Sequence, residues 1–300
     1  MQSRARLTAG VAAGVAAVVL VLGGCTSEDP ASDPVAESSP SPPATPAPPA
    51  TPSASPEPEV TIRAVPAPPP LGACYRMGLT SATRPTNASQ PVPCTGPHTA
   101  QTVHVGRLDL TPGERRLRLD APAVQQQPAR TCPARLRQYV GGTTDTLRRS
   151  RLEVVWFTPT LGQAERGARW FRCDAVAVAD DDRLLRLPLG PRLRGLLDRP
   201  GALTTYGLCG TAQPGTPGFR RVACALPHRW EAVSTIDLAG GARYPGTARV
   251  RAAGEETCAD QVGERSGLVL EFRYGWEWPT RAQWAAGQRH GYCWAPSRPS

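Results

Sequence analysis

The sequence contains no lysine, although its formal net charge is +9 at pH 7. All 34 basic residues are arginines, and they are scattered along the chain rather than gathered in blocks. Abundant Ala, Pro and Gly beside arginine is typical of a GC-rich coding sequence, and scattered charges are typical of solvated faces. We therefore expect no nucleic-acid partner. A basic patch that faces an acidic envelope polymer or an anionic lipid stays open as an alternative.

The sequence also lacks the motifs of common hydrolases, since Gly-x-Ser-x-Gly, Ser-x-x-Lys and His-Glu-x-x-His are all missing. A glycosidase needs a pair of carboxylates. Four acidic residues fall near expected strands, but none falls at a repeat-equivalent position: Glu153, Asp174, Glu271 and Glu277. The run from Asp180 to Asp182 lacks the ligand spacing of a calcium loop. We predict no catalytic residues and no cofactor, so the chain is not expected to be an enzyme.

One apolar run stands out, between Leu7 and Gly24, and it ends in Leu-Gly-Gly-Cys at Cys25. Two arginines before a short apolar segment, with small residues and a cysteine after it, are typical of a bacterial lipoprotein signal. We predict a signal peptide over 1–24 and lipidation of Cys25, with fatty acids such as palmitate. The chain would then lie at the cell membrane on the extracytoplasmic face, held by its lipid. The alternative is an uncleaved membrane anchor, because the run is nearly long enough to span.

Large apolar side chains are almost missing from the next segment, which is rich in Pro, Ala, Ser and Thr. Such a segment cannot bury enough surface to fold. We predict that 25–70 is the lipidated cysteine followed by a disordered linker. In extended polyproline II form it would reach on the order of 120 Å, which makes it a tether.

The chain has nine cysteines, and eight remain when Cys25 is set aside for lipid. An even number in an exported chain favours disulfides over free thiols. The eight predicted disulfide cysteines are Cys74, Cys94, Cys132, Cys173, Cys209, Cys224, Cys258 and Cys293.

These cysteines belong to an internal repeat. Val-x-Cys-x-x-Pro-His occurs at Cys94 and again at Cys224, and seven later residue pairs, beginning with Trp156 and Trp276, are each separated by 120 positions. Each copy holds four cysteines in the same order. We predict one domain over 71–180, an inter-repeat linker over 181–206 and a second domain over 207–296.

The second copy indicates the structure of the unit. Val222–Cys224 and Trp230–Leu238 have strand character, 256–262 is expected to be a short helix, and 268–278 is a further expected strand. Thr280-x-x-Gln283 matches a capping box, repeated at 160–163, and would start a helix of about two turns before the strand that carries the last cysteine. The fold class is α+β, two tandem small disulfide-bonded domains of about ββαβαβ each after the disordered Pro-rich linker.

Four cysteines allow three pairings in each copy. We favour first with second and third with fourth, because the first two fall on neighbouring strands and the third falls on a helix that docks near the last strand.

His98 and His228 directly follow proline at equivalent positions. A Cys-x-x-x-His pair could supply two metal ligands. No other repeated histidine completes such a set, so we favour a structural turn in which the imidazole bonds neighbouring groups. No metal is expected, and metal capture remains an alternative.

Two further features have a structural and a functional interpretation. The leucines between Leu184 and Leu197 could form a membrane-surface helix, but Pro188 and Pro191 interrupt it, and packing on the first copy is favoured.

The tryptophans of the second copy could form a binding platform. In a small domain they more often fill the core. Trp284, which aligns with Ala164, is the best candidate for an exposed one.

The combined motifs resemble the septum-formation-related domain of actinobacterial envelope proteins. They are Gly-x-Cys, Val-x-Cys-x-x-Pro-His, a third cysteine followed by Tyr139-Val140-Gly141, and then Pro, Gly-x-Arg and Cys. The second copy departs from the pattern with Arg265-Ser266-Gly267. The resemblance implies a lipoprotein or single-span protein with two tandem copies and a link to cell division. The resemblance implies no catalytic residue in this chain.

The expected function is therefore a membrane-anchored extracytoplasmic lipoprotein that acts as a noncatalytic binding or scaffolding module of the cell envelope. Its expected partners are the membrane, through the lipid anchor, and cell-wall or divisome components. Two alternatives remain, an envelope enzyme acting on peptidoglycan or glycolipid and a metal-binding lipoprotein. A concave site with two or more convergent polar groups would favour the enzyme.

Overall fold

The computed structural model describes residues 64–113, 115–267 and 272–297. The predicted signal peptide, the predicted lipidation site Cys25 and most of the predicted linker lie outside these ranges. Within them, no helix is both long and apolar enough to cross a membrane.

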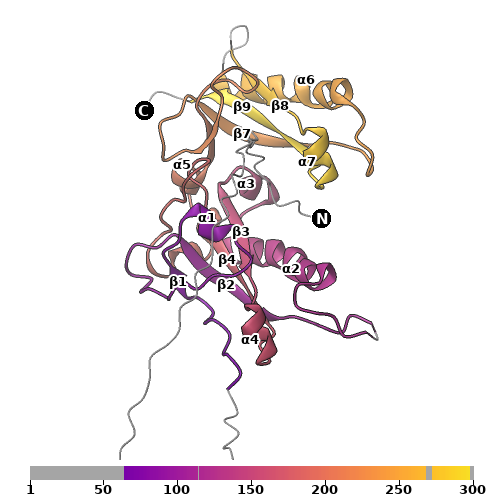
Figure 1. Cartoon of the computed structure of the whole chain (residues 1–300). Helices are drawn as coiled ribbons and strands as arrows, with labels where there is room; N and C mark the ends of the chain where they lie inside the picture. Colours follow the sequence, from indigo (N-terminus) through magenta and orange to yellow (C-terminus); the bar gives the residue numbers. More distant parts are fainter. Residues whose placement is uncertain (1–63, 114, 268–271, 298–300) are drawn as a thin grey trace, which may run out of the picture. The chain divides into compact units, whose positions relative to one another are not determined.

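The first repeat builds a four-stranded antiparallel sheet in the order β1-β2-β4-β3. Its elements are β1 (Cys74–Tyr75), α1 (Leu79–Ala82), β2 (Ala100–Arg107), α2 (Pro122–Val140), α3 (Thr144–Arg148), β3 (Leu152–Phe157), α4 (Leu161–Glu165) and β4 (Trp170–Ala177). Helix α2 contacts β2, β3 and β4 and so covers one face of this sheet (Figure 1).

The second repeat builds a five-stranded antiparallel sheet in the order β6-β5-β7-β9-β8. Its elements are β5 (Leu208–Gly210), β6 (Arg221–Ala223), β7 (Trp230–Asp237), α6 (Thr247–Ser266), β8 (Gly275–Glu277), α7 (Arg281–Ala285) and β9 (His290–Pro296). Helix α6 contacts β7, β8 and β9. The α+β class is therefore confirmed.

The two sheets share their plan. Without β6, the order β5-β7-β9-β8 repeats the order β1-β2-β4-β3. The counterpart of β6 in the first repeat is an isolated bridge between Cys74 and Val92. Both long strands also carry a register shift at the same place, between Thr102 and His104 in β2 and between Ala232 and Ser234 in β7.

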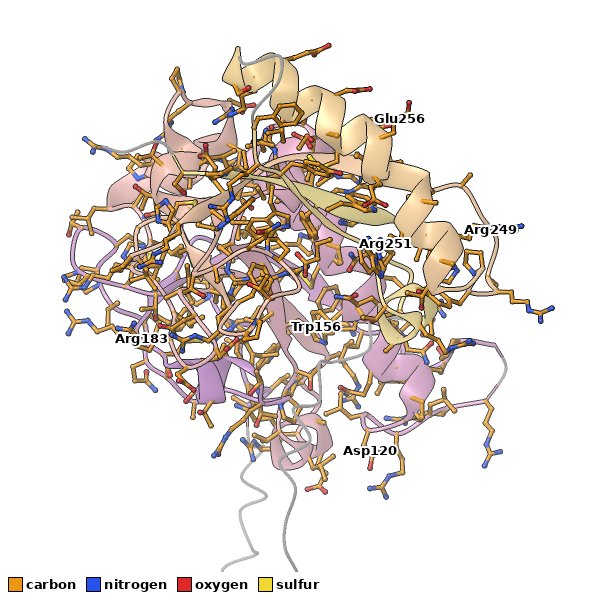
Figure 2. The ribbon with its side chains drawn as sticks, turned by 90° about the horizontal axis from the view of Figure 1, so that it is seen from above. Asp120, Trp156, Arg183, Arg249, Arg251 and Glu256 are labelled. Atoms are coloured by element: carbon orange, nitrogen blue, oxygen red, sulfur yellow. A yellow bond between two sulfur atoms is a disulfide. The ribbon has the colours of Figure 1, made fainter. Side chains whose placement is uncertain are left out.

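The long helices bury every fourth residue. In α2 these are Val124, Pro128, Cys132, Leu136 and Val140. In α6 they are Val250, Gly254, Cys258 and Val262. Figure 2 shows the opposite side of α6, where Arg249 and Glu256 point away from the protein. Because the buried stripe is narrow and contains small residues, the predicted helix over 256–262 is much shorter than the observed α6.

The strand predictions were right in place and partly wrong in length. The predicted strand over 268–278 is observed only as β8, Gly275–Glu277, and 268–271 lie outside the described residues. The sequence placed Cys209 on a strand but gave that strand no bounds, because β5, Leu208–Gly210, is too short to show an alternating pattern.

Both predicted capping boxes are present. The backbone N of Gln163 donates to Thr160 Oγ1 at 3.2 Å, and the backbone N of Thr160 donates to Gln163 Oε1 at 3.0 Å. Thr280 and Gln283 make the same pair of bonds. The helices that follow have five residues each, shorter than the predicted two turns.

Most leucines of the connecting segment pack on the first repeat, as favoured from the sequence, whereas Leu189 is 49% exposed. This segment contains η1 (Gly190–Leu193), η2 (Leu196–Asp198) and α5 (Ala202–Tyr206). Leu187, Leu193, Leu196 and Leu197 are buried in the same core as α2.

Trp284 is fully buried, which corrects its prediction as an exposed binding residue. Its indole N–H donates to the carbonyl of Gly241 at 3.0 Å. Tyr244 packs edge-on against its ring, and the guanidinium of Arg289 lies over it at 4.2 Å.

The two repeats contact each other through α3. Asp145 Oδ1 accepts hydrogen bonds from the backbone N and the hydroxyl of Thr235, at 2.7 and 3.0 Å. The backbone N of Leu208 also donates to the carbonyl of Arg149 at 2.7 Å. Both side-chain and main-chain bonds therefore join the repeats.

Candidate functional site

Four disulfides bond the eight cysteines in the pairing that the sequence favoured. Cys74 bonds Cys94, Cys132 bonds Cys173, Cys209 bonds Cys224, and Cys258 bonds Cys293. The first bond of each repeat joins β1 or β5 to the segment that leads into the Pro-His turn. The second joins the long helix to the central strand that it covers.

The two Pro-His turns have the same geometry. His98 Nδ1 lies 2.9 Å from the carbonyl oxygen of Gly96, and His228 Nδ1 lies 2.7 Å from that of Leu226. In both turns the imidazole therefore bonds the backbone two residues earlier. This is the structural arrangement favoured from the sequence, and it uses one nitrogen of each ring.

The second turn holds the one group of possible metal ligands found among the described residues. Donor atoms of Cys209, Cys224 and His228 all lie within 4.8 Å of one another. The two sulfurs are bonded to each other. Because a cysteine binds a metal as its thiolate, the two cysteines of this group could act as metal ligands only after reduction of their disulfide.

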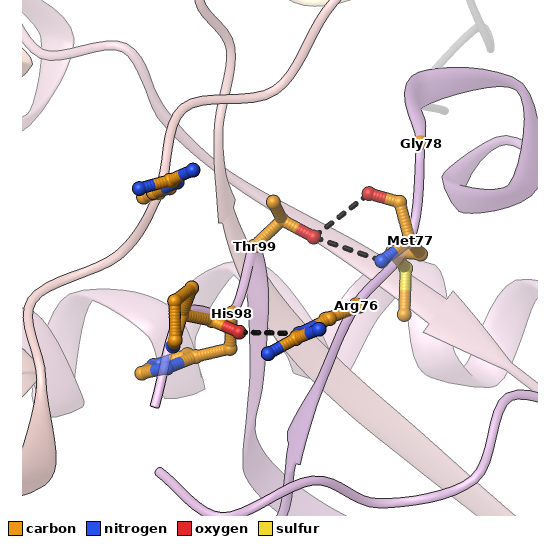
Figure 3. A pocket seen from close by; sticks show the side chains of 7 residues that line it. Arg76, Met77, Gly78, His98 and Thr99 are labelled. Atoms are coloured by element: carbon orange, nitrogen blue, oxygen red, sulfur yellow. Dashed lines mark hydrogen bonds between the residues drawn. The ribbon is translucent and has the colours of Figure 1, made fainter. Parts of the chain in front are cut away.

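A pocket of about 480 Å³ lies beside the first turn (Figure 3). Its walls are Arg76, Met77, Gly78, Pro97, His98, Thr99 and Arg186. This volume is in the range of small-molecule sites. Sequence reasoning identified His98 but missed the two arginines, which are 110 positions apart and carry no local motif.

The first arginine of the pocket is fixed by the turn. Arg76 Nε donates to the carbonyl oxygen of Pro97 at 2.8 Å. The hydroxyl of Thr99 bonds both backbone groups of Met77, donating to its carbonyl at 2.7 Å and accepting from its N–H at 2.9 Å (Figure 3). The segment that carries Arg76 is thereby tied to the segment that carries His98.

The second arginine reaches the pocket because the connecting segment docks on the turn. The backbone N of Leu187 donates to the carbonyl of His98 at 2.9 Å. The hydroxyl of Tyr206 donates to the carbonyl of Arg186 at 3.1 Å. The main chain at Arg186 is therefore held on both sides.

The pocket is positively charged. In the described part of the chain, no carboxylate forms an ion pair with Arg76 or Arg186. The pocket walls contain no acidic residue. His98 is 1% exposed, and its Nε2 has no hydrogen-bond partner among the described residues. The arrangement can attract an anion.

The second turn borders a smaller pocket of about 240 Å³ with a different charge. Thr211 and Pro227 line it at the positions equivalent to Arg76 and Pro97. Asp180 and Arg183 also line it, and they form an ion pair at 2.6 Å. Its cationic charge is therefore partly neutralised, unlike that of the first pocket.

Two of the acidic residues considered from the sequence are paired with arginines. Asp174 is buried against Arg172, and burial raises the pKa of its carboxyl to about 6, although Arg172 partly opposes this shift. Glu277 pairs with Arg221 at 2.9 Å and accepts a hydrogen bond from the indole of Trp294. Glu271 lies outside the described residues.

These features define a disulfide-bonded α+β protein with an internal repeat and a cationic pocket beside its first Pro-His turn. The family model described as Septum formation matches residues 71–293 in a single match that includes both repeats. The chain belongs to this septum-formation family. Comparisons with curated proteins and with solved structures gave no match.

Proposed function

We propose that this chain is a lipid-anchored, extracytoplasmic and noncatalytic binding module of the cell envelope that takes part in septum formation. The observation that carries the proposal is the family match over 71–293. The Leu-Gly-Gly-Cys sequence ending at Cys25 supports the lipid anchor. Four disulfides support an oxidising compartment.

The pocket favours binding over catalysis. Its polar side chains are two arginines, a histidine with one nitrogen bonded to backbone, and a threonine hydroxyl engaged by Met77. General acid–base catalysis by a carboxylate has no candidate in these walls. An envelope enzyme would need a second site elsewhere on the chain.

The anchor is tested by metabolic labelling in the native host. Cells carrying the tagged wild-type chain or the Cys25→Ala variant are grown with radioactive palmitate and then fractionated. We expect label on the wild-type chain and none on the variant, with release of a mature chain that begins at residue 25 only in the wild type. Equal labelling of both chains, or a wild-type chain in the cytosolic fraction, contradicts the proposal.

The septal role is tested by crosslinking and imaging. The tagged wild-type chain is crosslinked in living cells, purified, and its partners are identified, while a fluorescent fusion is followed through division. We expect recovery of division or wall-synthesis proteins and enrichment at the division site. Recovery of lipids alone together with uniform fluorescence would argue against a septal role while leaving the lipid anchor in place.

A further inference from the structure

We propose that the pocket between Arg76 and Arg186 binds a phosphate group, carried by a ligand with a small apolar part. This inference deepens the proposed binding function and rests on it only in taking the pocket as a binding site. The argument depends on charge, donor geometry and preorganisation within residues 76–99 and 186, and it does not depend on the lipid anchor.

Charge comes first. Two guanidinium groups face one pocket of about 480 Å³, and among the described residues neither has a carboxylate partner. Uncompensated cations that share a concave surface repel each other, and a bound anion relieves this repulsion. An arginine stays charged at any physiological pH, so the attraction is permanent.

Donor geometry favours phosphate over carboxylate. Arg76 uses only its Nε on the carbonyl of Pro97, which leaves the N–H groups of both terminal nitrogens to donate. The guanidinium of Arg186 has no hydrogen-bond partner within the described residues, so its whole planar fork remains available. A carboxylate has two oxygens for these donors. A phosphate has more oxygens and up to two negative charges, which matches two arginine forks.

Part of the site is preformed, although the side chains of Arg76 and Arg186 are exposed. Arg76 is held by Pro97 at 2.8 Å, and the main chain at Arg186 is fixed by Leu187 and Tyr206. Less side-chain and loop freedom is therefore lost when a ligand binds. Met77 and Pro97 add an apolar wall beside the charges. A ligand with a short aliphatic part next to its phosphate fits both surfaces.

The second repeat supplies an internal comparison. Its pocket has Thr211 in the place of Arg76 and has a carboxylate, Asp180, on Arg183. The same turn therefore borders a cationic pocket in one repeat and a neutralised pocket in the other. Arg220, an exposed arginine in the wall of the second pocket, is the matched control position.

The test is calorimetric titration of the full mature chain in detergent with its disulfides intact. The probes are inorganic phosphate, glycerol 3-phosphate and a short-chain phosphatidic acid, with acetate as the control anion. We expect saturable 1:1 binding of a phosphate probe and weaker binding of acetate. Arg186→Ser and Arg76→Ser should each weaken binding about tenfold or more, as for lost hydrogen bonds between charged groups. Arg220→Ser should change it less than twofold.

The probes also distinguish the source of the phosphate. Tight binding of glycerol 3-phosphate supports a soluble or wall-linked phosphate, and binding of phosphatidic acid alone supports a lipid headgroup. Arg186 has no side-chain partner to lose within the described residues, so its variant should fold like the wild type by circular dichroism. No saturable binding of any phosphate probe, or unchanged affinity in the Arg76→Ser/Arg186→Ser double variant, overturns the inference. Such a failure leaves the palmitate and septal tests unaffected.

Discussion

Arg172 Nε lies 3.0 Å from Asp174 Oδ2 in the core of the first repeat, where the two side chains are 3% and 0% exposed. The hydroxyl of Thr102 donates to Asp174 Oδ1 at 2.7 Å, and the guanidinium of Arg172 lies over the rings of Tyr75 and Phe157. This is the one ion pair among the described residues in which both members are almost fully buried. The pair lies on the sheet face opposite α2.

In the second repeat, aromatic residues occupy the positions of this buried ion pair. Tyr292 and Trp294 stand 120 positions after Arg172 and Asp174 and belong to a buried cluster with Trp230. Desolvating two charges is costly, and apolar residues of similar volume often replace a buried pair without loss. The repeats therefore share a sheet plan but not the chemistry of this core.

Replacing Asp174 tests the buried pair. We expect Asp174→Ala to lower the free energy of unfolding by about 3–5 kcal/mol at pH 7, because the buried guanidinium of Arg172 and the hydroxyl of Thr102 both lose their hydrogen-bond acceptor. Urea denaturation followed by tryptophan fluorescence measures the change. Asp182→Ala, at an exposed loop position, is the control and should stay within about 0.5 kcal/mol of the wild type. If the variant at Asp174 lost no more free energy of unfolding than the control, the buried pair would not stabilise the fold.

The pH dependence of stability should contain two opposing contributions. Burial raises the pKa of Asp174 to about 6, so its contribution to stability is fully present below about 3.9, the unfolded value, and is lost as the pH rises through 6. Burial, with help from Arg148, lowers the pKa of His290 to about 4. Its contribution is present above about 6.5 and is lost as the pH falls towards 4.

The contribution of His290 to the pH dependence of stability can be tested with a variant that has no imidazole. We expect His290→Gln to become more stable relative to the wild type as the pH falls from 7 to about 4.5, because the acid-side penalty of His290 is gone. Urea unfolding at three pH values across this range measures the difference. A difference that does not change with pH would mean that His290 titrates normally in the folded chain.

The disulfides should contribute unequally. The chain-entropy model gives about 4 kcal/mol for the loop closed by Cys132 and Cys173, with a separation of 41, and about 3 kcal/mol for Cys209 and Cys224, with a separation of 15. We therefore expect the Cys132→Ala/Cys173→Ala variant to lose more free energy of unfolding than the Cys209→Ala/Cys224→Ala variant. Thermal unfolding of the two variants ranks them. The reverse order would show that strain or packing, rather than loop closure, sets their contribution.

Trp284 should behave as a core residue. Trp284→Ala is expected to cost about 3–5 kcal/mol, because it removes a fully buried indole and leaves the carbonyl of Gly241 without its donor. The comparison is Leu161→Ala, which truncates a side chain that is 51% exposed and should cost far less. Similar denaturation midpoints for the two variants would contradict the observed burial of Trp284.

Local patterns in the sequence predicted much of this fold. The capping boxes at Thr160 and Thr280 were found because two side chains three residues apart satisfy each other's helix end. The disulfide pairing was found because four cysteines recur in the same order, the first two on neighbouring strands and the third on a helix that docks near the last strand. These signals are short in sequence and depend little on the rest of the chain.

Features that depend on tertiary contacts were missed. The stripe of α6 includes Gly254, which is small because the ring of Trp276 lies against it, so hydrophobicity alone does not mark the helix. The cationic pocket joins Arg76 to Arg186 only because the connecting segment docks on the turn. The burial of Trp284 depends on Tyr244 and Gly241, which no pattern around Trp284 indicates.

The eight bonded cysteines pair consecutively along the chain, the first with the second, the third with the fourth, the fifth with the sixth and the seventh with the eighth. A polypeptide oxidised while it emerges from its amino end would therefore meet each correct partner first, with no need for later reshuffling. Cys25 would be the one early competitor for Cys74. If Cys25 is lipidated as proposed, its sulfur is a thioether and cannot compete with Cys94 for Cys74.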